Sequence, residues 1–411
     1  RHTVDVLEAL TSNEKPLQKM INLIDKNSEI YPSLADINTD NSTKNPNVAT
    51  PNQLAALKIT EHFAPLTNEV KAGSDSQPHL DDIMKKLSEL KFYMQTIQKS
   101  PEPAQTALKA IMAEFNLERT NPVIDLKRLA NEAAEPLSTQ LNHIADEAWT
   151  VELKTALSEI NKLWNRNVYS FYQSRIANRY PLNRKATQSI SLDDFREFFG
   201  PNGRVQRFYN DYLKFFLEDN TELSVVNGES IISPEFLTAL QDLQDIQRNY
   251  FDGSGNVNVS FSLKPLGLSG KFTASTLNID GQLLKYSHET PSASRLIWPN
   301  TTRQDVETSL TLISSTGETA TLRKTGDWSL FRIFDAASKK ANGQSIDLSF
   351  KLNGGAINYR LTVENGTNPF FNHILNEFIL PPKLIDTENN NGETQPIEIN
   401  EEELEDSNIE M

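Results

Sequence analysis

Hydrophobic residues recur at helical spacing from the start of the chain to about Tyr250. The clearest stripe, Leu80, Ile83, Leu87, Leu90, Met94 and Ile97, follows one face of a helix that Ser100-Pro101 should end. A longer helix is predicted from Ser138 to Tyr172, and Ser191 and Ser233 stand where two later helices should have their N-caps. Because apolar helix faces must be buried, we expect these helices to pack as a bundle.

The hydrophobic period changes to two after Asp252-Gly253-Ser254-Gly255, which indicates β-strands. Ile346 to Leu352 and Ile357 to Val363 alternate on either side of Asn353-Gly354-Gly355, which predicts a hairpin. Further short β-like runs, among them Gly326 to Arg332, are expected between Asn278 and Asp335. About eight such strands favour a small antiparallel β-sandwich whose core holds Trp298 and Trp328.

The predicted fold class is therefore α+β, with an N-terminal multi-helix region, a small antiparallel β-sandwich and a short C-terminal helix. The expected divisions are a helical region over 1–137, a helical subdomain over 138–252, the β-sandwich over 253–367, the C-terminal helix over 368–382 and an acidic tail over 383–411. We expect the tail to be disordered, because it is poor in apolar residues and carries one sign of charge.

The net charge of -15 is concentrated at the C-terminus, where ten acidic residues and no Lys or Arg follow Lys383. A surface of this sign argues against nucleic acid as a partner, since phosphate-binding faces need clustered positive charge. The chain has no cysteine, which excludes disulfides and Cys-based zinc sites. It begins at Arg1, so we expect a fragment or processed product whose membrane anchor would lie upstream.

No motif for catalysis, a metal or a cofactor is evident. Gly267-Leu268-Ser269-Gly270-Lys271 has the wrong spacing for a phosphate loop, and Asp252, Ser254 and Asn256 begin a calcium-like loop that lacks its Gly and Glu. The basic cluster Arg175, Arg179, Arg184 and Lys185 could bind a phosphate or an acidic partner. We favour a structural role for these four residues, at helix ends and stacked on Tyr172 and Tyr180.

A series of short motifs in one order resembles the C-terminal, periplasmic part of the IcmF/TssM family of bacterial secretion proteins. The motifs are Arg179-Tyr180-Pro181-Leu182, Asp194 to Gly203, Phe208 to Leu213, Ile279-Asp280-Gly281-Gln282, Trp298-Pro299, Gly326 to Arg332, Asn368-Pro369-Phe370 and Phe378-Ile379-Leu380-Pro381. Asp327 departs from the family pattern, which commonly has Pro before the Trp, and the acidic tail is not a family hallmark.

The resemblance implies the periplasmic domain of a bacterial inner-membrane protein that serves as a scaffold in a type VI or type IVB (Dot/Icm) secretion complex. It implies a DotU/TssL-type inner-membrane protein and an outer-membrane lipoprotein as partners, and homo-oligomers are possible. Together with the lack of catalytic and cofactor motifs, the scaffold role leads us to expect neither an enzymatic activity nor a cofactor. Which of the two secretion systems the chain serves stays open at this point.

Two exposed turns of the β domain are our candidates for partner binding, because their Gly and Ser content suits surface loops. They comprise Ser314, Ser315, Thr316, Gly317 and Glu318 in one turn, and Asn353, Gly354 and Gly355 in the other. Two alternatives are a cell-wall-directed hydrolase using a carboxylate pair, and a glycan-binding module using exposed Trp298 or Trp328.

Overall fold

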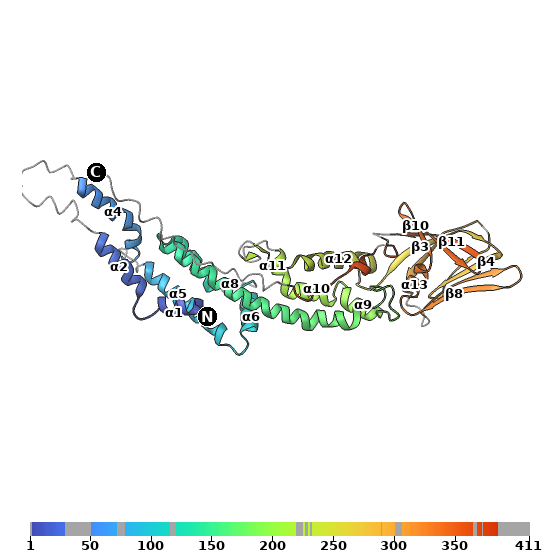
Figure 1. Cartoon of the computed structure of the whole chain (residues 1–411), viewed down its shortest axis with the longest axis horizontal. Helices are drawn as coiled ribbons and strands as arrows, with labels where there is room; N and C mark the ends of the chain where they lie inside the picture. The colour runs from blue at the N-terminus through green and yellow to red at the C-terminus, as the bar shows by residue number, and fades with distance from the viewer. Residues whose placement is uncertain are drawn as a thin grey trace, which may run out of the picture.

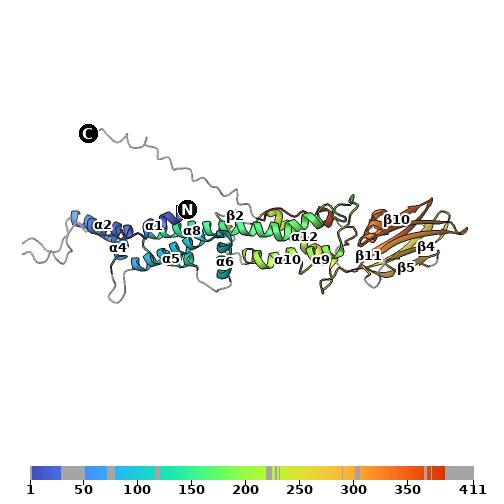
Figure 2. The same cartoon turned by 90° about the horizontal axis from the view of Figure 1, so that it is seen from below.

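The computed structural model describes residues 2–28, 51–71, 79–115, 121–218, 225–226, 229–230, 232–288, 290–300, 306–364, 368–371 and 373–384. An elongated helical part is followed along the long axis by a β domain (Figures 1 and 2). The α+β class and the order of its parts agree with the sequence prediction. The predicted acidic tail lies outside the described residues, apart from Lys383 and Leu384.

The first part of the chain forms helices that pack side by side. Their bounds are α1 His2–Leu10, α2 Pro16–Ser28, α4 Pro51–Asn68, α5 His79–Lys99, α6 Pro103–Phe115, α7 Pro122–Glu132 and α8 Leu137–Trp164. All six residues of the stripe predicted on α5 are buried. The α8 helix continues through two π-helical segments, η1 Asn165–Tyr169 and η2 Tyr172–Ile176, and so runs past the predicted end at Tyr172.

The second group of helices carries a cluster of buried aromatic residues, among them Phe195, Phe198 and Phe199. It comprises α9 Leu192–Phe199, α10 Arg204–Phe208, the π-helical η3 Tyr209–Leu213, α11 Lys214–Glu218 and α12 Pro234–Tyr250, with short strands β1 Val225–Val226 and β2 Glu229–Ser230 between α11 and α12. Both predicted N-caps are present, because Ser191 Oγ accepts from the Asp194 N–H and Ser233 Oγ accepts from the Phe236 N–H.

The β domain contains two antiparallel sheets. One has the order β6-β3-β11-β10-β9, and the other has the order β5-β4-β7-β8. The strands are β3 Val259–Ser269, β4 Phe272–Ile279, β5 Gln282–Tyr286, β6 Ser294–Trp298, β7 Glu307–Ser314, β8 Thr319–Thr325, β9 Ser338–Asn342, β10 Ser345–Leu352 and β11 Gly355–Val363. The sheets face each other, since Ser275 of β4 and Tyr359 of β11 place their buried hydroxyl oxygens 3.5 Å apart.

The predicted hairpin is confirmed, with Leu352 of β10 paired to Gly355 of β11. The prediction of a β-like run at Gly326 to Arg332 is wrong, because Ser329–Asp335 forms the helix α13. Leu330, Phe331, Ile333 and Phe334 are buried while Arg332 and Asp335 are not, which is helical spacing, but a segment of seven residues is too short for that spacing to stand out.

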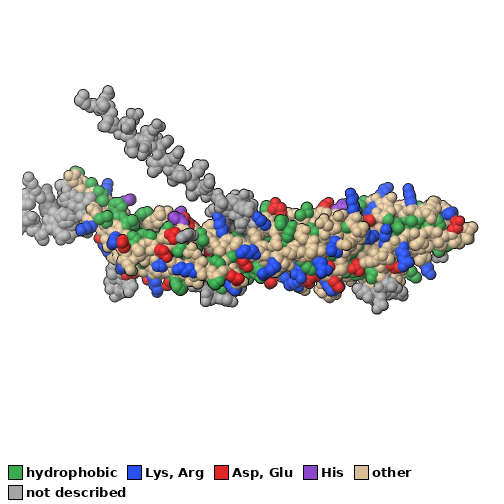
Figure 3. All heavy atoms as spheres, turned by 60° about the horizontal axis from the view of Figure 1, so that its bottom comes forward, with side chains coloured by type: hydrophobic (Ala, Val, Ile, Leu, Met, Phe, Trp, Pro, Cys, Tyr) green, Lys and Arg blue, Asp and Glu red, His purple; other side chains and the backbone are tan. Residues whose placement is uncertain are grey.

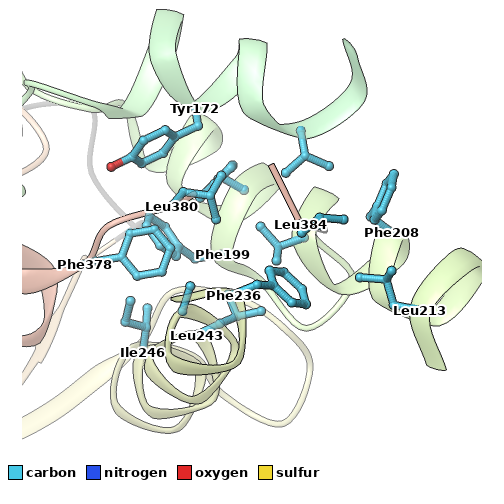
Figure 4. Close-up of a cluster of buried hydrophobic side chains, with 14 of the residues drawn as sticks. Tyr172, Phe199, Phe208, Leu213, Phe236, Leu243, Ile246, Phe378, Leu380 and Leu384 are labelled. Atoms are coloured by element: carbon cyan, nitrogen blue, oxygen red, sulfur yellow. The ribbon is translucent and has the colours of Figure 1, made fainter. Parts of the chain in front are cut away.

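The C-terminal helix is shorter than predicted. Asn368 Oδ1 accepts from the Phe370 N–H, which forms an Asx turn, and the helix α14 covers only Ile374–Glu377. Residues 373–384 then return from the β domain to the helices. We call this segment the strap. Figure 4 shows Phe378, Leu380 and Leu384 of the strap among buried residues of η2, α9, α10 and α12.

None of the described helices is long and apolar enough to cross a membrane.

Candidate interaction surface at the tip of the β domain

The two predicted binding turns lie at the same end of the β-sandwich, which we call the tip. Ser314 to Glu318 connects β7 to β8, and Asn353-Gly354 connects β10 to β11. The strand β3 begins beside the helices, where Phe251 and Val257 form a β-bridge, and runs away from them to Ser269. Since Ser269 pairs with Ala356, the tip is the end of the sandwich that is remote from the helices (Figure 1).

A third turn, Ser269-Gly270-Lys271 between β3 and β4, joins the other two. Gly270 has a φ of +82°, and a Cβ placed there would lie 2.6 Å from the carbonyl oxygen of Gly354. On its other side, Lys271 Nζ lies 2.5 Å from Glu318 Oε2. The sequence shows only that this turn lacks the spacing of a phosphate loop, so its place in the candidate site is a finding of the structure.

Not every predicted site residue is available to a partner. Ser314 is buried, and its Oγ accepts from the Glu318 N–H at 3.0 Å, so it holds the turn in shape. Gly355 is also buried, because Phe272 of the facing sheet occupies the space that a side chain would need. The exposed members are Ser315, Thr316, Gly317, Glu318, Asn353 and Gly354.

The surface of the tip is polar. The Lys271 ammonium lowers the pKa of Glu318, first through the hydrogen bond and then through its charge. Both side chains are more than half exposed, so the pair contributes little to stability and its two charges are open to a partner. Backbone groups of tight turns and a pair of opposite charges suit recognition of another protein surface.

The opposite end of the sandwich is joined to the helices. Trp328 Nε1 donates to the Ile190 carbonyl at 2.7 Å, and Trp298 Nε1 donates to the Asp327 carbonyl at 3.1 Å. Trp298 has an exposed fraction of 0% and Trp328 of 1%. The core placement predicted for both rings is confirmed, and the hypothesis that either one forms a glycan-binding platform is wrong.

The four residues of the basic cluster do not stack on Tyr172 and Tyr180 in the way we predicted. The cation over the Tyr180 ring is Arg332, with its guanidinium carbon 4.0 Å from the ring centre. Arg184 instead donates to Asn376 Oδ1 and lies 3.7 Å from Asp335, while Arg175 lies 3.9 Å from Asp194.

The sequence did not predict two buried carboxylates, one on α8 and one in the turn before β5. Glu152 of α8 is fully buried, and burial raises its pKa to about 7. Asp280, in the turn before β5, has a pKa that burial raises to about 6. They lie on different parts of the molecule, and within the described ranges no group of three or more His, Asp or Glu residues is placed to hold a metal ion.

Comparison with known proteins identifies two family regions. Residues 155–256 match the model of the type VI secretion protein IcmF helical domain, and residues 261–365 match that of the IcmF C2-like domain. Together the two regions cover about half of the chain. They are consecutive, and they correspond to the α8–α12 and β3–β11 parts of the structure.

The chain is 24% identical over 355 residues to the type VI secretion system component TssM1 of Pseudomonas aeruginosa. The alignment covers 81% of this chain and 31% of that protein, so the chain spans about a third of its relative. A solved type VI secretion system membrane core complex contains a similar chain, with a TM-score of 0.68, 22% identity, and coverage of 89% of this chain and 78% of that one. A chain of a second solved structure, a type VI membrane complex, is similar with a TM-score of 0.71 and 19% identity. This similarity covers 98% of the present chain and 76% of the other one. These likenesses show a shared fold.

Proposed function

We propose, from the premise that the chain belongs to the family of the type VI secretion protein IcmF, that it is a structural part of a type VI secretion membrane core complex. In this proposal the chain is the periplasmic part of an inner-membrane protein, and it acts as a scaffold that binds other envelope components. The family regions favour type VI over the type IVB system that the sequence left open.

The observation that carries the proposal is the separation of the two ends of the β domain. One end is fixed to the helices through Trp328, Arg332 and Tyr250, whose polar atoms bond to Ile190, Ala186 and Pro369. The other end, the tip, presents three adjoining turns to solvent. An elongated molecule with one anchored and one free end suits a scaffold that holds a binding surface at a distance (Figure 2).

The proposed partner of the tip is an outer-membrane lipoprotein of the complex, bound through the exposed turn residues Ser315 to Glu318 and Asn353-Gly354. A DotU/TssL-type inner-membrane protein would bind the membrane-proximal part of the longer protein. Further copies of the same chain are a third candidate partner.

Site-specific photo-cross-linking in the full-length protein tests this proposal. A photoreactive amino acid is placed at Thr316 or at Asn353 in the tip, and at Gln344 as the matched control. Gln344 is an exposed turn residue at the opposite end of the sandwich. Cross-links to an outer-membrane lipoprotein from both tip positions, with none from Gln344, are the expected result.

Equal cross-linking from all three positions, or none from the tip in an assembled complex, contradicts the role of the tip. Failure of the full-length protein to co-purify with any envelope protein contradicts the scaffold function itself. In that case, turnover of peptidoglycan by the purified chain, abolished by an Asp or Glu substitution, would establish the hydrolase alternative.

A further inference from the structure

A groove of about 870 Å³ lies beside the strap, on the helical part of the molecule. Its walls are the η2 segment and the residues that follow it, the loop at residues 182–185, and the strap from His373 to Pro382. The lining includes Tyr172, Leu182, Arg184, Lys185, His373 and Ile379. We call it the cationic groove, because no Asp or Glu lines it while Arg184 and Lys185 do.

The sequence makes this region unusually basic for an acidic protein. Residues 160–192 contain no Asp or Glu, and they hold six bases, Lys162, Arg166, Arg175, Arg179, Arg184 and Lys185. The positive charge of Arg184 is partly compensated by Asp335, because Arg184 Nη1 lies 3.7 Å from Asp335 Oδ1. Lys185 is exposed, and no carboxylate of the described residues forms an ion pair with it. The face in Figure 3 shows charged side chains of both signs spread along the molecule.

The groove also offers apolar surface. Ile379 has an exposed fraction of 74%, although its neighbours Phe378 and Leu380 are buried beneath it. The aromatic rings of Tyr169 and Tyr172 line the same space. An occupant of this groove must therefore combine acidic side chains for Lys185 and Arg184 with apolar side chains for Ile379.

The C-terminal residues 385–411 of this chain have that chemistry. They carry all ten of the acidic residues that follow Lys383, with no Lys or Arg. Apolar residues are interspersed, and Ile397 and Ile399 alternate with Glu398. In an extended segment, that alternation places the two isoleucines on one face and the carboxylate on the other.

The strap places the start of this segment next to the groove. Pro382 lines the groove, and Leu384 is fixed two residues later, because its N–H donates to Asn161 Oδ1 and its carbonyl oxygen accepts from the Ser233 N–H. A 27-residue segment spans up to roughly 90 Å when extended, so length does not prevent its return. Tethering gives an effective concentration on the order of millimolar, so binding with an intrinsic Kd of about 1 mM is enough to half-populate the bound state.

We propose that the acidic C-terminal segment, residues 385–411, binds in the cationic groove of its own chain. The segment then masks Lys185, Arg184 and Ile379, and a competing acidic partner would have to displace it. This inference rests on the groove and the charge distribution, and it is independent of the proposed scaffold function.

Distance measurements in the full chain test the proposal. Because the chain has no cysteine, substitution of Gln173→Cys in the groove and Asn400→Cys in the segment gives two unique sites for spin labels. At low ionic strength we expect a population of short inter-label distances. At about 1 M salt the Debye length is about 3 Å, so charge pairs are screened. Loss of the short-distance population at this salt concentration would show that charge pairing holds the segment in the groove.

The charge-reversal variant Lys185→Glu should remove the short-distance population, whereas Lys351→Glu, at an exposed position on β10, should retain it. A distance distribution that neither salt nor Lys185→Glu alters would overturn the proposal. A further control mixes chains labelled only at residue 173 with chains labelled only at residue 400. If short distances arise only between such separate chains, the groove is occupied by the segment of a second copy, and the proposal is overturned.

A second measurement needs no substitution. Carbodiimide treatment of the wild-type chain joins amines to carboxylates in direct contact, and the products are identified by mass spectrometry. Joining of Lys185 to glutamates of residues 385–411, in preference to Lys351, supports the proposal. Equal joining at the two lysines contradicts it.

Discussion

The indole nitrogen of Trp328 donates a hydrogen bond to the backbone carbonyl oxygen of Ile190, over a distance of 2.7 Å. This bond crosses from α13 in the β domain to the residue just before the N-cap of α9. The Trp328 ring also meets the Phe195 ring edge to face, with 5.2 Å between centroids, and it is 1% exposed. The two parts of the molecule are therefore joined by a buried polar contact set within an aromatic cluster.

Replacing Trp328 with Phe should lower the free energy of unfolding by about 2 to 4 kcal/mol, because the change leaves the Ile190 carbonyl without its donor and opens a cavity. The measurement is urea-induced unfolding followed by circular dichroism. Trp149→Phe is the matched control, since Trp149 is also buried but its indole nitrogen has no hydrogen-bond partner in the described part of the chain. Equal losses in the two variants would show that the hydrogen bond contributes nothing.

The strap provides a second pair of matched positions. Phe378 is 3% exposed and contacts the rings of Phe199 and Tyr172, whereas its neighbour Ile379 is 74% exposed. Phe378→Ala should destabilise the chain by about 3 to 5 kcal/mol, the usual cost of truncating a buried aromatic side chain. Ile379→Ala should change stability by less than about 0.5 kcal/mol. Thermal unfolding of both variants measures the difference, and similar melting temperatures would contradict the packing of the strap.

Local signals account for the parts of the fold that the sequence predicts well. The α5 stripe, the Ser191 and Ser233 caps and the hairpin at Asn353 each depend on residues within one element or turn. The α13 helix was mistaken for a β-like run because it is only seven residues long, too short for its helical spacing to stand out. It packs against β7 and β8, and the local sequence does not show these contacts.

Contacts between distant residues explain what the sequence missed in the candidate sites. The tip is completed by Lys271 and Glu318, which are 47 residues apart. The strap is held by Trp164 Nε1, which donates to the Pro381 carbonyl across 217 residues. The single sequence shows the polarity of each segment but not which segments meet. It therefore predicted two of the three turns of the tip and nothing of the cationic groove.

Two glycines of the tip test its geometry. Gly270 and Gly317 both have positive φ, but a Cβ on Gly270 would meet the Gly354 backbone at 2.6 Å, whereas a Cβ on Gly317 would meet nothing within 4 Å. Gly317→Ala should cost only the conformational penalty, about 1 to 2 kcal/mol. Gly270→Ala should cost more, because the β10–β11 turn must also shift. Urea unfolding compares them, and an equal loss would show that the turns do not touch.

Glu152 gives the chain a pH-dependent stability. It lies buried in α8, where the Tyr93 hydroxyl donates to its Oε1. Its pKa is raised from 4.5 to about 7, mainly by burial and in smaller part by the charge of Glu114, while the hydrogen bonds from Tyr93 and Asn121 oppose the shift. Because the folded state holds this proton more tightly than the unfolded state, the stability that Glu152 contributes falls as the pH rises from about 4.5 to about 7.

At pH 8 the free energy of unfolding of Glu152→Gln should therefore be larger than that of the wild type, because Gln carries no charge to bury. The difference between the two proteins should shrink as the pH is lowered to 5. The shift from 4.5 to about 7 corresponds to a change of about 3 kcal/mol in this difference. Urea unfolding of both proteins at several pH values measures it. Glu147→Gln, at a half-exposed carboxylate on the same helix, controls for the loss of a charge. If the curves of Glu152→Gln and the wild type run parallel from pH 5 to pH 8, the buried carboxylate is not protonated in the folded chain at neutral pH.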